Sequence, residues 1–141
     1  MTAITSFSGK YAWLSNFYPC SVLFEGHLYP SVEHAFQAAK WHPSQRAQFR
    51  KSGVSAAYAK KLGKCTPRPL DWDTRKLQVM RQCIADKYNH PNLMYLLSAT
   101  GDAELVEGNT WGDVFWGVCR GKGENMLGKL LMERRAYKDT K

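Results

Sequence analysis

The stretch YPSVEHAFQAAKW, residues 29–41, is the most informative part of the sequence, because it predicts a helix and the side chains that share one face of it. Its Tyr-Pro-Ser start ends an extended run, and the Ser31 hydroxyl is typical of a helix N-cap. Glu33, Gln37 and Lys40 follow at positions i, i+4 and i+7, so a helix places them on one face. A carboxylate, an amide and an amine in this arrangement indicate either a solvated stripe or one wall of an active site.

The other side chains of this predicted helix, which covers about residues 31–42, favour the active site. They are small or apolar: Val32, Ala35, Phe36, Ala38 and Ala39. A helix with so few other polar groups is buried on most sides, so Glu33 and Lys40 would lie in a cleft. Burial raises the pKa of a carboxyl and lowers that of a lysine, which suits a general base and an amine nucleophile. The alternative is a solvated helix surface, where the spacing adds roughly 0.2–0.5 kcal/mol.

The composition indicates one globular domain with an anionic partner. The 141 residues are 44% hydrophobic and 23% charged, so we expect a single domain over residues 1–141. Twenty Lys and Arg against twelve Asp and Glu give a net charge of +8, which favours phosphorylated metabolites, nucleotides or nucleic acid. The basic residues are scattered, which favours small phosphate substrates over a polynucleotide. Five tryptophans are typical either of a core or of a concave site for rings and sugars.

The cysteines and the start of the chain indicate a reduced, cytoplasmic protein. The four cysteines form no C-x-x-C pair, and the Cys and His spacings fit no zinc motif. We therefore expect no metal, no cofactor and no structural disulfide, although one thiol could serve as a nucleophile. The first residues contain neither a signal core nor a cleavage site, and no apolar run is long enough to cross a bilayer.

The remaining segments predict a helix-rich α+β fold with a small β-sheet near the N-terminus. Strand signals occur over residues 11–19 and 21–30, and the second run contains a hairpin turn at Glu25-Gly26. A further short strand is predicted over residues 103–108. Additional helices are predicted over residues 44–62 (as one or two short helices), 74–88, 92–100 and 124–137.

A second group of candidate site residues lies in EGNTWGDVFWG, residues 107–117. Glu107 and Asp113 occur there with Trp111 and Trp116 among three glycines. Glycines allow the backbone to approach a ligand closely. Two indole rings with carboxylates suit a planar heterocycle attached to a sugar. The alternative is a hairpin whose tryptophans fill the core.

Two further motifs give weaker binding signals. In RGKGEN, residues 120–125, helix-start amides with Arg120 and Lys122 would form a phosphate seat, although the P-loop pattern is absent. In LSNFYP, residues 14–19, Asn16 lies among aromatic neighbours. Its amide could hold a sugar hydroxyl or, as is commoner, cap a turn.

Four motifs in this order resemble those of the NADAR family, whose members are also called YbiA-like proteins. They are LSNFYP (14–19), YPSVEHAFQAAK (29–40), TGDAELVEGNTWGDVFWG (100–117) and GKGENMLGKLLMERR (121–135). The likeness runs from about Phe7 to Arg135 and is weakest over residues 43–70. It implies a YbiA-like fold and an N-glycosidase that cleaves the C1′–N bond of ribosyl or ADP-ribosyl compounds. The substrates implied are phosphorylated ribosylamino-pyrimidine intermediates of riboflavin synthesis or, in some members, ADP-ribose on guanine.

The resemblance also implies roles for individual residues. Its Glu-x-x-x-Gln-x-x-Lys helix matches Glu33 and Lys40 as the acid and the lysine, and its Trp/Asp-rich segment matches Asp113. Phe36 stands where many relatives carry Tyr, so a hydroxyl function is not expected there. The matched binding positions are Asn16, Phe17, Trp111, Trp116 and Gly117, to which the residue patterns add Gln37, Glu107 and Arg120.

The chemistry leaves two routes open. Cleavage passes through an oxocarbenium-like state, which a carboxylate near C1′ stabilises. Either Glu33 or Asp113 activates a water that attacks C1′, or neutral Lys40 attacks and forms a Schiff base that water releases. We prefer the second route because Lys40 shares a face with Glu33. Two alternatives are an ADP-ribosyl-guanine hydrolase acting on modified nucleic acid and a non-catalytic module that binds nucleotides or ADP-ribose.

Overall fold

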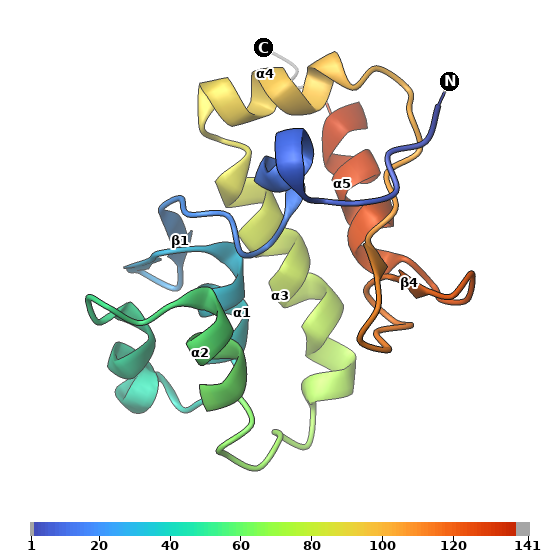
Figure 1. The fold of residues 1–141 in the computed structure, drawn as a ribbon. Helices are drawn as coiled ribbons and strands as arrows, with labels where there is room; N and C mark the ends of the chain where they lie inside the picture. Colours follow the sequence, from blue (N-terminus) through green and yellow to red (C-terminus); the bar gives the residue numbers. More distant parts are fainter. Residues whose placement is uncertain (1, 138–141) are drawn as a thin grey trace. The chain divides into compact units, whose positions relative to one another are not determined.

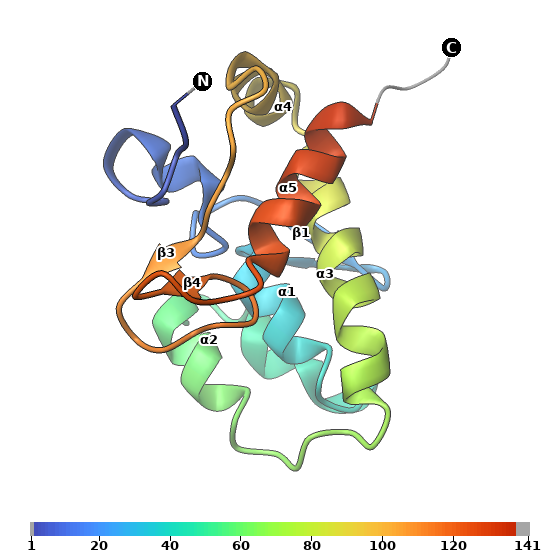
Figure 2. The same ribbon diagram turned by 90° about the vertical axis from the view of Figure 1, so that its right-hand side faces the viewer.

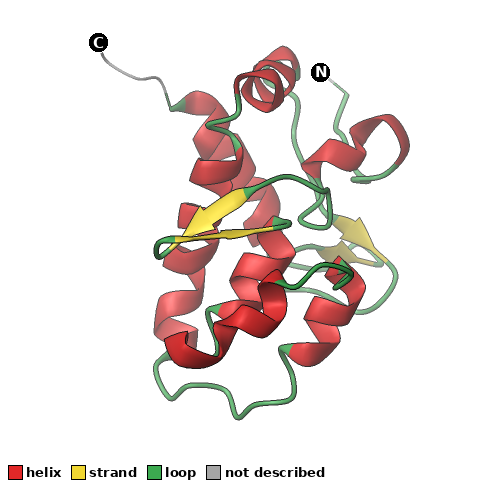
Figure 3. Ribbon diagram, turned by 90° about the vertical axis from the view of Figure 1, so that its left-hand side faces the viewer, coloured by secondary structure: helices red, strands yellow, loops and turns green. Residues whose placement is uncertain are grey.

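The computed structural model describes residues 2–137, so Met1 and residues 138–141 of the predicted domain lie outside the described residues. The chain divides into two compact units (Figure 1). Unit 1 comprises residues 1–15 and 88–141, and unit 2 comprises residues 16–87. In both units helices predominate and strands occur as short pairs (Figure 3). The predicted helix-rich α+β class with a small N-terminal sheet is confirmed, whereas one domain over residues 1–141 stays a prediction.

Unit 2 begins with the predicted hairpin. Strand β1 (Val22–Phe24) pairs antiparallel with β2 (His27–Tyr29), with Leu23 opposite Leu28. The turn residues Glu25 and Gly26 both have positive φ, 46° and 87°, as a two-residue hairpin turn requires. The Glu-Gly signal in the sequence therefore located this turn correctly.

Helix α1 (Val32–Ala38) starts where the sequence predicts but ends earlier. The Ser31 side chain accepts a hydrogen bond from the backbone N–H of His34 at 3.2 Å, which confirms the N-cap. The predicted end near residue 42 is wrong. The Lys40 N–H bonds to the Gln37 carbonyl three residues back, so a tighter turn replaces the last part of the helix.

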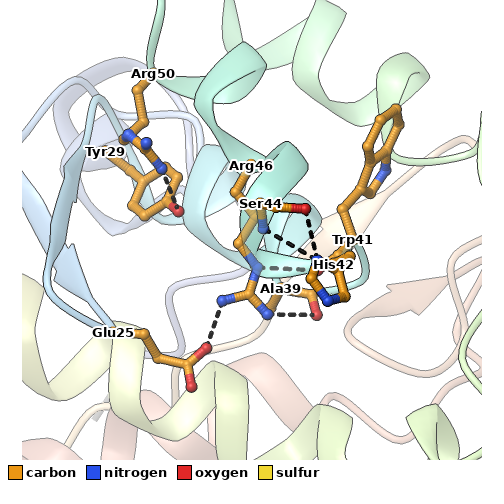
Figure 4. A network of polar contacts seen from close by, with 8 residues as sticks. All are labelled: Glu25, Tyr29, Ala39, Trp41, His42, Ser44, Arg46 and Arg50. Atoms are coloured by element: carbon orange, nitrogen blue, oxygen red, sulfur yellow. Dashed lines mark hydrogen bonds and ion pairs between the residues drawn. The ribbon is translucent and has the colours of Figure 1, made fainter.

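Arg46 holds this tighter turn in place. Its Nε donates to the Trp41 carbonyl at 3.0 Å and its Nη2 to the Ala39 carbonyl at 3.4 Å, while Nη1 pairs with Glu25 of the hairpin (Figure 4). Arg46 is buried. A cation on the free carbonyls at a helix end also offsets the helix dipole. The end of α1, where Lys40 lies, is therefore fixed from outside the helix.

The rest of unit 2 covers α1 on two sides. The predicted short helices over residues 44–62 are present as the 3-10 helix η2 (Pro43–Arg50) and α2 (Ala56–Leu62). Helix α3 (Trp72–Lys87) is the predicted long helix with an earlier start. Helices α2 and α3 both pack against α1 (Figure 2).

The hairpin is tied to α3 by one polar contact. The Leu23 N–H donates to the Asp86 carboxylate at 2.7 Å. Met80 and Ile84 are buried on α3, as their spacing predicts. The core of unit 2 therefore surrounds α1 with the hairpin, α2 and α3, which explains why all seven residues of α1 are buried, the polar ones included.

Unit 1 starts with a helix where the sequence predicts a strand. Residues 9–14 form the 3-10 helix η1 (Gly9–Leu14), so the strand prediction over residues 11–19 is wrong there. Trp13 and Leu14 are adjacent and both buried. A strand with one exposed face would place them on opposite sides, whereas a tight helical turn buries both.

The remaining helices of unit 1 agree with the sequence, and its strands are shorter than predicted. Helices α4 (Pro91–Ala99) and α5 (Met126–Ala136) follow the predicted ranges. The predicted strand over residues 103–108 is wrong in its bounds. Only Leu105 forms a bridge, with Ile4, before strand β3 (Gly108–Asn109), which pairs parallel with β4 (Val118–Cys119).

Candidate functional site

The polar face of α1 is buried inside unit 2. Glu33 and Gln37 are only 8% and 6% exposed, so both side chains have left water. The Gln37 Nε2 donates a hydrogen bond to Glu33 Oε2 at 2.6 Å, which confirms that the two lie one turn apart on one face. The structure thus contains a buried acid held by an amide, and the solvated-stripe alternative is wrong.

The first family motif contacts α1 through its backbone. The Asn16 carbonyl accepts the N–H of Glu33 at 3.0 Å, so Asn16 adjoins the start of α1. The Asn16 Nδ2 points to the Met80 sulfur at 3.6 Å, a weak acceptor. Phe17 is substantially exposed next to this contact. Asn16 and Phe17 therefore lie beside the acid, with the polar groups of Asn16 turned to α1 and α3.

Lys40 lies just past the end of α1, against two aromatic rings. Its Nζ is 5.6 Å from the Phe36 ring centroid and 5.7 Å from that of Trp72. These rings pack on each other at 5.2 Å. Burial lowers the pKa of the Lys40 amine, and this effect outweighs the attraction of Glu33, which raises it. The Lys40 amine is therefore shifted toward its neutral, nucleophilic form.

Trp72 is a site neighbour that the sequence did not reveal. It is buried at the first position of α3, and the Arg75 guanidinium also lies over its ring at 5.4 Å. The only signal was a tryptophan between two aspartates at a predicted helix start. Such a pattern is also typical of helix capping, so sequence alone could not assign it to the lysine environment.

Gly63 gives Gln37 the space it occupies. A Cβ at Gly63 would lie 2.0 Å from Gln37 Oε1 and 2.8 Å from its Cδ. Within the part of the chain that the structure describes, this buried Oε1 has no hydrogen-bond partner. The carbonyl end of Gln37 therefore faces the α2 terminus, and its amide end faces Glu33.

The second candidate group lies in unit 1 and is built differently. The Asp113 Oδ1 accepts the backbone N–H groups of Phe115 at 3.1 Å and Trp116 at 2.9 Å. The Asn109 side chain donates to the Asp113 carbonyl at 2.8 Å and accepts its N–H at 3.0 Å. One oxygen of the Asp113 carboxylate is thus occupied in folding the loop.

The tryptophans of this loop do not fill the core. Trp111 is 61% exposed, and the partly exposed Trp116 packs edge-on against Phe115 at 4.8 Å. Strands β3 and β4 are parallel, so the alternative of an antiparallel hairpin with buried tryptophans is wrong.

Gly117 and Glu107 meet closely in unit 1. A Cβ at Gly117 would lie 2.1 Å from the Glu107 carbonyl oxygen and 2.6 Å from its Oε2. The Glu107 N–H donates to the Asn125 side chain at 2.9 Å. Glycine at position 117 is therefore needed for the close approach of Glu107, whereas the approach of a ligand to this backbone stays a prediction.

The predicted phosphate seat at residues 120–125 is not available in the expected form. The N–H groups of Glu124, Asn125, Met126 and Leu127 donate to carbonyls of residues 114–117. Arg120 has φ of 53° in a tight turn closed by bonds between Cys119 and Lys122. Because loop carbonyls already bind the first amides at the start of α5, these amides cannot also bind a phosphate. Arg120 remains exposed.

A second lysine with a lowered pKa lies elsewhere in unit 2. Lys87, at the end of α3, is almost completely buried, and burial lowers its pKa to about 8. Its Nζ lies 5.7 Å from the Tyr18 ring centroid. Burial also raises the pKa of the nearby Cys20 thiol, on which the Lys87 charge acts in the opposite direction. The sequence gave no sign of this pair.

The thiols and the acidic side chains do not form an obvious alternative site. All four cysteines are free, and burial raises the pKa of Cys83 to about 12, so this thiol stays protonated. Among residues 2–137, no three His, Cys, Asp or Glu side chains come together as a metal site. No helix in the same range is both long and apolar enough to cross a membrane.

Comparison with known proteins identifies the family of the chain. The NADAR domain model matches residues 5–137, which cover unit 2 and most of unit 1. The chain is 38% identical to N-glycosidase YbiA of Escherichia coli strain K12, over 92% of this chain and 83% of YbiA. It is 39% identical to an N-glycosidase of Nostoc punctiforme, over 89% of this chain and 84% of the relative.

One more relative and one solved structure extend the comparison. A riboflavin biosynthesis protein of Vibrio vulnificus is 37% identical over 87% of this chain, which spans 34% of that relative. The NMR structure of E. coli YbiA superimposes with a TM-score of 0.83 at 38% identity, over 95% of this chain and 83% of that chain. The YbiA-like fold predicted from the sequence is confirmed.

Proposed function

Because the chain belongs to the NADAR family and its relatives are N-glycosidases, it is an N-glycosidase, and we propose that it hydrolyses the C1′–N bond of a phosphorylated ribosylamine through Lys40. One observation carries this proposal. The buried Glu33 is held by Gln37 on α1, and just past the end of that helix lies Lys40, whose pKa is lowered by burial. A purely binding protein has no need for a buried acid beside an amine with a lowered pKa.

Glu33 serves as the acid and base of the reaction. Protonated Glu33 gives its proton to the ring oxygen, the ring opens, and C1′ becomes an iminium carbon bonded to the base nitrogen. The same carboxylate, now charged, stabilises this cation. Gln37 orients Glu33 through the 2.6 Å hydrogen bond, and because its Oε1 faces Gly63 we assign Gln37 to positioning.

Lys40 serves as the nucleophile. Its neutral amine adds to C1′, a proton moves to the base nitrogen, and the C1′–N bond breaks, which leaves a Schiff base between C1′ and Nζ. Water then adds to C1′ and displaces the lysine, giving the free sugar and the free amine. Overall, one substrate molecule and one water give the free sugar and the released base. Burial lowers the pKa of Lys40 and so favours the neutral amine that starts this sequence.

Borohydride trapping tests the covalent route. Wild-type protein reduced during turnover of a ribosylamino-pyrimidine 5′-phosphate is expected to carry the reduced sugar on the peptide containing Lys40, as detected by mass spectrometry. Lys40→Met should carry no adduct and lose at least ~10³-fold in kcat. The matched control Lys51→Met replaces an exposed lysine of the same unit. It should form the adduct and keep the wild-type kcat. Full activity of Lys40→Met would exclude the route.

The substrate is tested separately. The relative named a riboflavin biosynthesis protein supports a ribosylamino-pyrimidine phosphate, whereas the net charge of +8 supports ADP-ribose on guanine in nucleic acid. Incubation with each compound, followed by detection of released base, distinguishes them. Release from the first alone is the expected result. Release from modified nucleic acid alone would assign the alternative hydrolase, and tight binding without release from either would assign a binding module.

A further inference from the structure

The cations around Lys40 outnumber the carboxylates that act on it. Lys60, Lys64 and Arg68 all lie near enough to affect the Lys40 amine electrostatically, and each lowers its pKa. Glu33 acts in the opposite direction. Four cations near one another repel, and an anion placed among them relieves that repulsion. The local charge therefore favours a negatively charged ligand beside the reacting amine.

The backbone fixes these cations beside α1. Lys60 lies in the last turn of α2, and Gly63, which follows that helix, lies against the Gln37 side chain. The next residue, Lys64, is held by a hydrogen bond from its N–H to the Lys61 carbonyl at 3.1 Å. The end of α2 therefore approaches the face of α1 that carries the acid. Both Lys64 and the following loop are exposed, so an incoming ligand can reach them.

Ordinary structural roles do not account for the whole cluster. Lys60 and Lys61 in the last turn of α2 interact favourably with the helix dipole, but Arg68 is outside that helix. Arg68 contacts Asp73 at 3.5 Å, where both side chains are more than half exposed, and Asp73 also contacts Lys76 at 3.3 Å. An exposed carboxylate shared by two cations neutralises neither fully. A net positive charge therefore remains beside Lys40.

We propose that Lys60, Lys64 and Arg68 form an anion subsite for the phosphate of the ribosyl substrate, while Glu33 and Lys40 act at C1′. The inference rests on the proposed function for the sugar part of the ligand. A guanidinium binds two phosphate oxygens at once, and the two ammonium groups add point charges.

A phosphate bound in the subsite changes the pKa of Lys40. The charged groups around the Lys40 amine are Glu33 on α1, Lys60 and Lys64 at the end of α2, Arg68 in the next loop, which contacts Asp73, and Arg75, which shares the Trp72 ring and contacts Asp71. A bound phosphate offsets the cations, so the pKa of Lys40 rises when substrate binds. The pKa seen in kcat should therefore exceed that seen in kcat/KM, and only for a phosphorylated substrate.

A charge-matched pair of triple variants tests the subsite. Isothermal titration calorimetry with ribose 5-phosphate is expected to show binding to the wild type, and at least ~10-fold weaker binding to Lys60→Ala/Lys64→Ala/Arg68→Ala. The control Lys51→Ala/Arg81→Ala/Lys129→Ala removes the same charge from exposed positions and should stay within about threefold of wild type. Unphosphorylated ribose should bind equally to all three. ADP-ribose in the same titration tells a diphosphate from a monoester.

The outcomes separate this subsite from the proposed function. Loss of ribose 5-phosphate binding in the triple variant, without hydrolysis of any ribosylamine by wild type, would leave the subsite standing and remove the function. Equal affinity of both triple variants, or no binding of either phosphate by wild type, would overturn the subsite. If the triple variant does not fold, Lys64→Ala/Arg68→Ala changes only exposed side chains and is titrated in the same way.

Discussion

The acid–amine helix α1 and the tryptophan loop of residues 107–117 both contain carboxylates among apolar residues, yet they use them differently. In α1 the buried Glu33 carboxylate accepts a hydrogen bond from the Gln37 side chain one turn away. In the loop Asp113 accepts two backbone N–H groups. A buried carboxylate oriented by an amide side chain is a better candidate for chemistry than one whose bonds fold a loop.

The largest expected effect comes from Glu33→Gln. The substituted amide keeps the shape and can still accept the hydrogen bond from Gln37, so the melting temperature should change little. Loss of the acid and base should lower kcat/KM on the order of 10²-fold or more, as measured by steady-state release of the base. Glu104→Gln makes the same substitution at an exposed position and serves as the control. Near-wild-type rates for Glu33→Gln would remove this carboxylate from the proposed role.

The pH dependence of kcat/KM gives the next largest effect. Burial lowers the pKa of Lys40 below its usual value, and the reaction needs the neutral amine. Because the proposed reaction also needs protonated Glu33, kcat/KM should pass through a maximum. It should fall at low pH, where the Lys40 amine is charged, and at high pH, where the Glu33 carboxyl has lost its proton, by up to about tenfold per unit on each side. A profile that does not depend on the ionisation of Lys40 would exclude its proposed role.

Gly63→Ala should have a smaller effect, because it acts on the acid indirectly. Its Cβ would lie 2.0 Å from Gln37 Oε1, so the amide has to move and Glu33 loses its hydrogen bond from Gln37. We expect about 1–3 kcal/mol of lost stability in chemical denaturation and a roughly tenfold lower kcat.

Removing the clash separates the two effects of that substitution. In Gly63→Ala/Gln37→Ala the overlap is gone, so stability should recover relative to Gly63→Ala while kcat stays low. Recovery of kcat together with stability would show that Gln37 fills space and does not orient Glu33.

The comparison also shows which parts of the molecule the sequence could predict. The i, i+4 spacing of Glu33 and Gln37 was sufficient because a helix converts spacing directly into position, whereas Lys40 lies in a tighter turn past the end of α1. The hairpin turn at Glu25-Gly26 was readable for a similar local reason. The end of α1 was not, because Arg46 fixes it from another helix.

Features that depend on distant residues were likewise out of reach of the sequence. The cations at the end of α2 and the Trp72 ring reach Lys40 only through the packing of separate helices. In the loop, an aspartate such as Asp113 is equally suited to catalysis and to turn formation. Its hydrogen bonds in the structure distinguish the two roles, and the spacing of residues in the sequence does not reveal those bonds.

The smallest expected effect on activity therefore belongs to Asp113. Asp113→Asn keeps an oxygen for the Phe115 and Trp116 N–H groups, so kcat/KM should fall by less than about tenfold and stability should stay close to wild type. Asp113→Ala leaves both N–H groups without this acceptor and should cost about 1–3 kcal/mol in chemical denaturation. A 10²-fold loss of kcat/KM in Asp113→Asn, with unchanged stability, would instead favour Asp113 as the residue that activates water. That result would reverse the comparison, because the loop would then supply chemistry and Glu33 would be a buried acid that α1 merely tolerates.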